Sequence, residues 1–107
     1  MTPRELLELA EQAAGNGAVW YEGLGMCIDE GGLLPRRWRP LEDNGDAIDL
    51  ALKLRMSIVI TALGPSARAE DRIKWEDENI AAGEDCGAAL CRAIVRAAAA
   101  CAQGRQS

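Results

Sequence analysis

Acidic side chains and cysteines are the residue types in this chain that could carry chemistry. Glu42, Asp43, Asp46 and Asp49 cluster where a helix is expected to begin, and such a cluster could hold a divalent cation or supply an acid and a base. The same carboxylates also fit helix capping and compensation of the helix dipole. The chain has no histidine, which is the commonest metal ligand and general base near neutral pH. We therefore expect this cluster to cap a helix.

The four cysteines lie at positions 27, 86, 91 and 101. No Cys-x-x-Cys pair exists to build a zinc site, and helical geometry turns Cys86 away from Cys91. A nucleophilic thiol needs a base or cation, and only Arg92 adjoins Cys91. The abundant apolar residues and the lack of a secretion signal favour free, buried thiols. We predict no catalytic residue, metal or cofactor; a small hydrolase or metal-dependent enzyme using Asp43, Asp46 or Cys91 is the enzymatic alternative.

Charge is concentrated in two short stretches that could contact a partner. The net charge is −5, and residues 70–85 contain seven acids against Arg72 and Lys74. Such a surface repels phosphates and favours basic partners, although a solvated face that only keeps a domain soluble has the same composition. Residues 36–39 are basic and aromatic, which suits stacking on bases, clamping phosphates or pairing with acids of the same domain. The candidate partner-binding residues are Glu70, Asp71, Glu76, Asp77, Glu78, Arg36, Arg37, Trp38 and Arg39.

The first half of the chain must position the basic stretch. Residues 2–5 (Thr-Pro-Arg-Glu) form a capping box that begins an amphipathic helix, and residues 15–17 (Gly-Asn-Gly) end it. Residues 19–22 and 26–29 are β-prone runs separated by glycines, which predicts a hairpin. Residues 33–40 contain two prolines and predict an irregular arm.

The second half must position the acidic stretch. Asp43 or Asn44 caps a helix of mostly apolar residues, which we expect to be the most deeply packed. Residues 57–62 are the clearest strand, and residues 64–66 (Gly-Pro-Ser) are expected to break it. Residues 72–76 alternate between polar and apolar, as in a partly exposed strand. A last helix begins at residue 85 and ends near residue 104. Its apolar face is expected to consist of Leu90, Cys91, Ile94, Ala97, Ala98 and Cys101.

This order predicts an α+β fold in a single domain spanning residues 1–107. We expect an α-β-β-α-β-β-α order, with about four strands in a small antiparallel sheet packed with three helices in α/β/α layers. The aromatic residues Trp20, Tyr21, Trp38 and Trp75 are expected to dominate the core.

Two stretches carry a resemblance to a known family. Residues 38–47 (Trp-Arg-Pro-Leu-Glu-Asp-Asn-Gly-Asp-Ala) and 92–98 (Arg-Ala-Ile-Val-Arg-Ala-Ala) resemble the small proteins of tailed phages and prophages grouped as the phage ABA sandwich domain. The resemblance implies a layered α/β/α domain in a phage or prophage context and transfers no catalytic residue. The glycine-rich residues 23–32, the cluster at 36–39 and the four cysteines depart from it.

The function predicted from these observations is protein–protein contact by a non-enzymatic phage or prophage accessory protein acting through its acidic surface. An inhibitor of a host defence complex is one concrete form, because such complexes carry basic grooves. The alternative is a nucleic-acid-binding accessory protein that uses Arg36–Arg39. No apolar run reaches the length of a membrane span, so we expect a cytoplasmic protein in a bacterial host cell, with a homo-oligomer as an open possibility.

Overall fold

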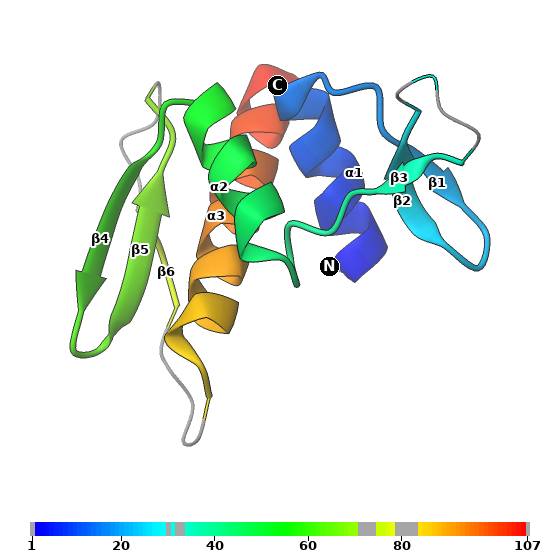
Figure 1. The fold of residues 1–107 in the computed structure, drawn as a ribbon. Coiled ribbons are helices and arrows are strands. Elements are labelled where there is room, and N and C mark those ends of the chain that lie inside the picture. Colours follow the sequence, from blue (N-terminus) through cyan, green and yellow to red (C-terminus); the bar gives the residue numbers. More distant parts are fainter. Residues whose placement is uncertain (1, 30, 32–33, 71–74, 79–83, 107) are drawn as a thin grey trace.

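The computed structural model describes residues 2–29, 31, 34–70, 75–78 and 84–106. In this part of the chain, three helices and six strands form an α+β fold, which confirms the predicted class (Figure 1). The elements are α1 (Pro3–Ala14), β1 (Val19–Tyr21), β2 (Gly25–Ile28), β3 (Arg36–Arg37), α2 (Asn44–Lys53), β4 (Ser57–Thr61), β5 (Gly64–Arg68), β6 (Glu76–Asp77) and α3 (Cys86–Gln106).

The strands form two three-stranded antiparallel sheets, where one sheet of about four strands was expected. Sheet A has the order β1-β2-β3 and sheet B the order β4-β5-β6. The helices lie between the two sheets, with sheet B against α3 and sheet A beyond α1 (Figure 1). This layering differs from the expected α/β/α arrangement. Its physical reason is the alanine-rich α3, whose small side chains let α1, α2 and β5 all pack closely around it.

Local signals placed the first two helices and the hairpin between them. The Thr2 hydroxyl accepts a hydrogen bond from the Glu5 N–H at 3.1 Å, and the Glu5 carboxylate accepts one from the Thr2 N–H, so the capping box is confirmed. The Asp43 carboxylate caps α2 by accepting from the Asp46 N–H. The first hairpin is confirmed as well, with Trp20 paired to Met26 across it.

Two strands arise from segments that were not expected to be strands. Residues 64–66 do not end the β structure; β4 turns at residues 62–63, and Gly64 starts β5, the central strand of sheet B. Pro65 lies where the pairing with β6 ends: its carbonyl accepts a hydrogen bond from the Glu78 N–H at 3.0 Å, and the paired residues of β5 are Ser66 and Ala67. The predicted arm contains β3, which pairs with β2. Tertiary pairing overrides weak local propensity in both cases.

The strand expected at residues 72–76 and the end of the last helix also differ from the prediction. Residues 72–74 lie outside the described part of the chain, and the strand next to them is β6 at Glu76–Asp77. The last helix continues past Gly104 to Gln106.

The core is built mainly from small residues of α3, and the aromatic residues contribute less than expected. Trp38 is buried, with 3% of its surface exposed, whereas Tyr21 is exposed at the hairpin and Trp20 is only half-buried. Ile94 and Leu50 are fully buried where α3 meets α2. The expected apolar face of α3 is confirmed by its buried members, which are Cys91, Ile94, Ala97, Ala98 and Cys101.

Candidate interaction surface

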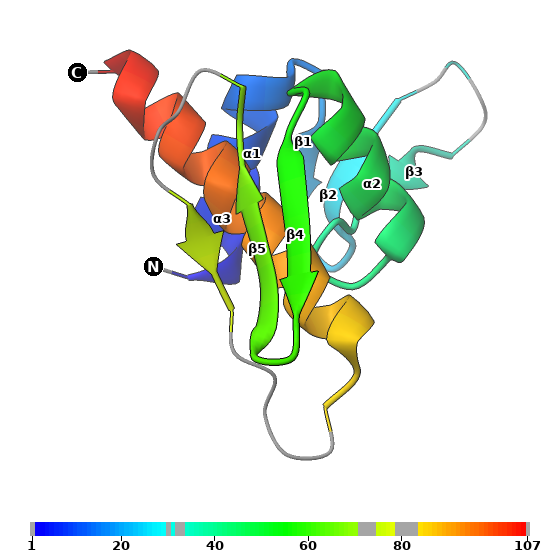
Figure 2. The same ribbon diagram turned by 90° about the vertical axis from the view of Figure 1, so that its left-hand side faces the viewer.

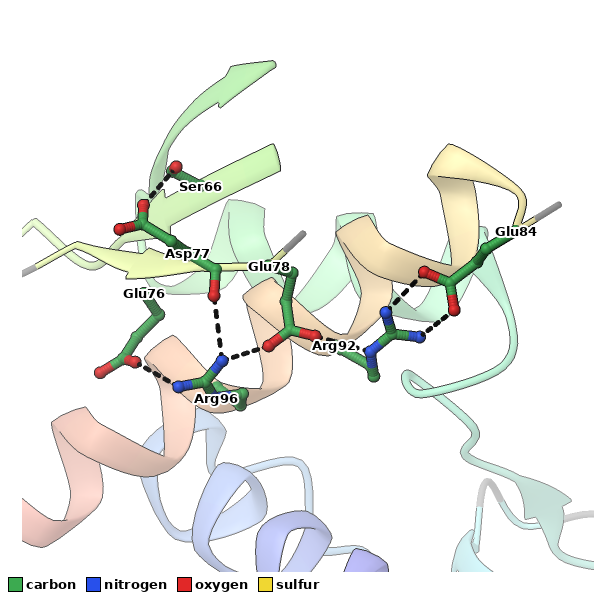
Figure 3. Close-up of polar contacts among 7 residues, drawn as sticks. All are labelled: Ser66, Glu76, Asp77, Glu78, Glu84, Arg92 and Arg96. Atoms are coloured by element: carbon green, nitrogen blue, oxygen red, sulfur yellow. Dashed lines mark hydrogen bonds and ion pairs between the residues drawn. The ribbon is translucent and has the colours of Figure 1, made fainter. Parts of the chain in front are cut away.

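Two arginines of α3 bind acidic residues of β6 and of the segment that follows it (Figure 3). Arg92 donates two hydrogen bonds to the Glu84 carboxylate, at 2.7 and 3.0 Å, and one from Nε to Glu78 at 2.7 Å. Arg96 lies one turn further along α3. Its guanidinium pairs with Glu78 and with Glu76, the latter at 3.2 Å. Glu78 therefore bridges the two guanidinium groups.

The bidentate geometry makes this a strong form of ion pair. The Glu84 and Glu78 side chains raise the pKa of the Arg92 guanidinium above its ordinary value, so Arg92 stays charged over the whole useful pH range. Arg96 also donates to the backbone carbonyl of Asp77 at 3.0 Å, which ties the strand itself to α3. The network therefore fixes β6, one edge of sheet B, onto the helix.

This network changes what the predicted acidic surface can offer to a partner. Glu76 and Glu78 face arginines of their own domain, and their charge is partly neutralised. Asp77 is exposed and hydrogen-bonded to the Ser66 hydroxyl. Glu70 is exposed after β5, and Asp71 lies outside the described residues. The structure thus uses much of the predicted surface to hold its own sheet.

The basic stretch at residues 36–39 is also engaged with its own domain. Trp38 packs in the core, so its ring is not available to stack on a base. Arg36 pairs with the buried Asp46 carboxylate at 3.1 Å, and the other oxygen of Asp46 accepts from the Arg39 N–H at 2.8 Å. The Arg37 side chain donates to a backbone carbonyl of the first hairpin. The nucleic-acid alternative loses its stacking platform in this arrangement.

A cleft of about 360 Å³ lies between α1 and this basic stretch. Its lining includes Trp20, Trp38, Arg4, Arg37 and Arg39. Each of the three guanidinium groups already has a partner, namely the ring of Trp20, a backbone carbonyl and the carboxylate of a neighbouring glutamate. An acidic ligand in this cleft would therefore have to compete with the partners that these three guanidinium groups already have.

The three residues weighed as catalytic groups have structural partners. Asp43 caps α2, Asp46 holds the basic stretch, and the Cys91 thiol donates to the side-chain oxygen of Asn44 at 3.1 Å. Burial raises the pKa of the Cys91 thiol, and the nearby Asp43 and Asp85 carboxylates push it further upward. A thiol with a raised pKa is a poor nucleophile at neutral pH.

The four cysteines are free thiols, and Cys86 is the one among them that is not fully buried. Within the described ranges, no three histidine, cysteine, aspartate or glutamate side chains gather closely enough to hold a metal ion. None of the helices that the structure describes is both long and apolar enough to cross a membrane.

The outer strand of sheet B presents an open edge that the sequence analysis did not single out. β4 pairs only with β5 among the strands of the described chain, so one row of its backbone N–H and C=O groups has no strand partner. Val59 is 46% exposed and Ile60 is 59% exposed, although successive residues of a strand point to opposite faces. Both faces of β4 are therefore accessible, as well as its edge.

A sequence signal for this edge was present. The run from Met56 to Leu63 contains no charged residue, and β-branched residues fill its centre. Such a run is typical of a strand covered on both sides, whereas here one edge of the strand is open. The fact that could not be seen was its position at the edge of sheet B, because β5 lies between it and β6.

Comparison of this chain with models of known protein families, with characterised proteins and with solved structures gave no match.

Proposed function

We propose that this protein works by contacting another protein chain, without catalysing a reaction, and that the open edge of β4 is the contact surface. The observation that carries the proposal is the combination of unpaired backbone groups with exposed, uncharged side chains on β4. An extended segment of a partner can add to such an edge as a further strand, with main-chain hydrogen bonds supplying affinity and side-chain contacts supplying selectivity.

The absence of edge protection supports this reading. Soluble proteins usually blunt an exposed edge with charges, prolines or bulges, because an open edge promotes unwanted association. β4 contains none of these between Ser57 and Thr61. An unprotected edge of this kind is therefore best explained by a partner that covers it.

The proposal differs from the acidic-surface form predicted above in where contact occurs. The carboxylates near β6 are largely paired with Arg92 and Arg96, so they offer a basic partner less than their number suggests. Asp77 and Asp85 stay exposed and can supplement a contact through charge. The phage or prophage setting, and a role as inhibitor of a host defence complex, are supported by the resemblance of residues 38–47 and 92–98 and by the net charge alone.

Binding to a display library of random peptides tests the proposal. We expect selected peptides to be β-prone and uncharged, and to perturb the backbone amide NMR signals of β4 on binding. The variant Ile60→Lys should weaken this binding about tenfold or more, because it places a charge at the edge. Leu34→Lys is the matched control, since Leu34 is a more exposed apolar residue outside sheet B. Peptides that bind equally to both variants, or shift only signals outside β4, would refute the proposal.

A further inference from the structure

The open β4 edge has a feature that points to one particular partner. Read in either direction, Ser57-Ile58-Val59-Ile60-Thr61 gives the same order of chemical types: hydroxyl, isoleucine, valine, isoleucine, hydroxyl. Antiparallel pairing of β4 with β4 of a second copy, about a two-fold axis at Val59, would therefore match like with like. Ser57 would face the second copy's Thr61, Ile58 its Ile60, and Val59 its Val59.

The backbone pattern of the hairpin fits this register. Thr61 pairs with Gly64 across a two-residue turn. The two residues that flank a turn of this length point their N–H and C=O groups toward each other, between the strands. Because the direction alternates along a strand, Ile58 and Ile60 turn their N–H and C=O groups toward the open edge. These are the two residues that meet across the proposed axis, so the second copy would satisfy the unpaired groups of both.

Side-chain burial within sheet B supports the same register. Ile58 and Ile60 share one face of the strand, yet Ile58 packs against the core while Ile60 is 59% exposed. In the symmetric pair, each Ile60 would lie beside the Ile58 of the second copy. The Ile60 side chain, which is exposed in the monomer, would thus be covered by Ile58 of the second copy. The two-fold symmetry produces this contact twice in each dimer.

Charge does not oppose the contact locally. The nearest charged residue on the same stretch is Arg55, and the register that centres on Val59 places it opposite the second copy's Leu63. Arg68 of β5 pairs with Ser57 of β4, and its guanidinium lies over the Trp75 ring, 4.8 Å from the ring centroid. Like charges are therefore not brought face to face along β4. At longer range, two chains of net charge −5 repel each other, and added salt screens that repulsion.

From these observations we infer that the chain forms a symmetric homodimer in which two β4 strands pair antiparallel and join the two copies of sheet B into a continuous six-stranded sheet. Figure 2 shows β4 as the outer strand of the β4–β5 hairpin, in front of the helices, where a second strand could be added. The inference rests on the proposed function, because it names the partner of the same edge. An isologous contact of this kind closes on itself, so it produces a dimer and leaves no open strand edge on that side.

Cysteine cross-linking of the full chain tests the register directly. Val59→Cys, made with Cys86→Ser to remove the one native thiol that is not fully buried, places two thiols opposite each other at the axis. A directly opposed pair of this type has a Cα separation of about 4.5 Å, which lies within disulfide range. We expect rapid formation of a disulfide-linked dimer under mild oxidation.

Two matched variants in the same background serve as controls. Leu24→Cys replaces an apolar residue of the same exposure as Val59, 46%, in the turn between β1 and β2, and should stay largely monomeric. Ile60→Cys should cross-link much more slowly than Val59→Cys, because in this register the two residues 60 of the dimer lie diagonally across the strands, roughly 7–8 Å apart. Equal cross-linking of the variants at positions 59, 60 and 24 would overturn the inference.

Sedimentation velocity of the unmodified chain gives an independent result that does not depend on any variant. We expect a monomer–dimer equilibrium that shifts toward dimer with concentration, persists or strengthens with added salt, and weakens about tenfold or more in Ile60→Lys. A monomer at every concentration would overturn the homodimer. If that monomer still bound library peptides at β4, the proposed function would stand, and if peptide binding were absent too, both would fall. A dimer that dissociated with salt would point to a charged interface and would also overturn the inference.

Discussion

The two edges of sheet B differ in charge and in cover. At the β6 edge, Arg92 and Arg96 reach from α3 to three glutamates, and the strand is bound to the helix through ion pairs and a backbone contact. At the β4 edge, an uncharged strand pairs only with β5 among the described strands and exposes Val59 and Ile60. Among the described residues, ion pairs therefore cover the β6 edge of sheet B, and no charged residue of β4 protects the β4 edge. Polar residues stabilise one edge, and apolar residues keep the other available.

Removal of Arg92 should have the largest effect on this difference. Arg92→Ala removes the cation that Glu78 and Glu84 share, although Glu78 keeps its ion pair with Arg96, and both carboxylates are mostly buried. We expect a loss of about 1–2 kcal/mol in the free energy of unfolding, which allows for solvent screening of a guanidinium that is 36% exposed. Urea denaturation measures it.

The control for that variant is Arg39→Ala, which removes an exposed ion pair with Glu42 of longer separation, 3.7 Å. It should cost less than about 0.5 kcal/mol. Equal losses for the two variants would show that the β6 edge is held by something other than its ion pairs.

Truncation within β4 should have the next largest effect, and should separate its anchored residue from its open ones. Ile58→Ala removes the side chain of β4 that packs against the core, and we expect a loss of about 1 kcal/mol, because the site is only partly buried. Val59→Ala should cost less than about 0.5 kcal/mol in the monomer. Urea denaturation at a protein concentration too low for association checks both. A larger loss at Val59 would mean that this face of β4 is covered.

A smaller effect is expected at high pH, and it should come from the core beneath the sheet. Because burial raises the pKa of Cys91 above its ordinary value of 9.0, the folded chain keeps that proton to higher pH than the unfolded chain does. Its contribution to stability is therefore full below about pH 9 and falls as the pH rises further. Arg92, with its own pKa raised, keeps the β6 edge closed over this range.

Urea denaturation from pH 7 to pH 10 checks this origin. Cys91→Ala should flatten the decline, and Arg92→Ala should keep it. A decline that vanished in Arg92→Ala would instead place the pH sensitivity at the ion-pair edge.

The smallest expected effect is that of a charge added to the open edge. Ile60→Lys should change the free energy of unfolding of the monomer by less than about 0.5 kcal/mol, since Ile60 is exposed. The same substitution should weaken association about tenfold or more. A substitution that weakens association and leaves the stability of the monomer unchanged marks a contact surface. A thermal unfolding scan at low protein concentration measures the stability of the monomer. A large loss of stability would show that Ile60 is part of the folded core.

The sequence by itself determined those features that depend on neighbouring residues. The capping box at Thr2 and Glu5, the Asp43 cap of α2, the glycine-rich hairpin and the buried face of α3 were all predicted correctly, because each is set by contacts within a few residues along the chain. The uncharged run that became β4 was also recognised as a strand.

Only the tertiary structure decided which strand lies at an edge and where each charge is used. Gly64 and Pro65 become part of a central strand because β4 and the residues of β6 pair on either side of it, which no local propensity encodes. Glu78 lies fourteen residues before Arg92, and their pairing requires β6 to lie along α3. The sequence does not distinguish a carboxylate that could bind a partner from one that pairs with an arginine of its own chain. The two differ only in whether the fold brings that arginine within hydrogen-bonding distance.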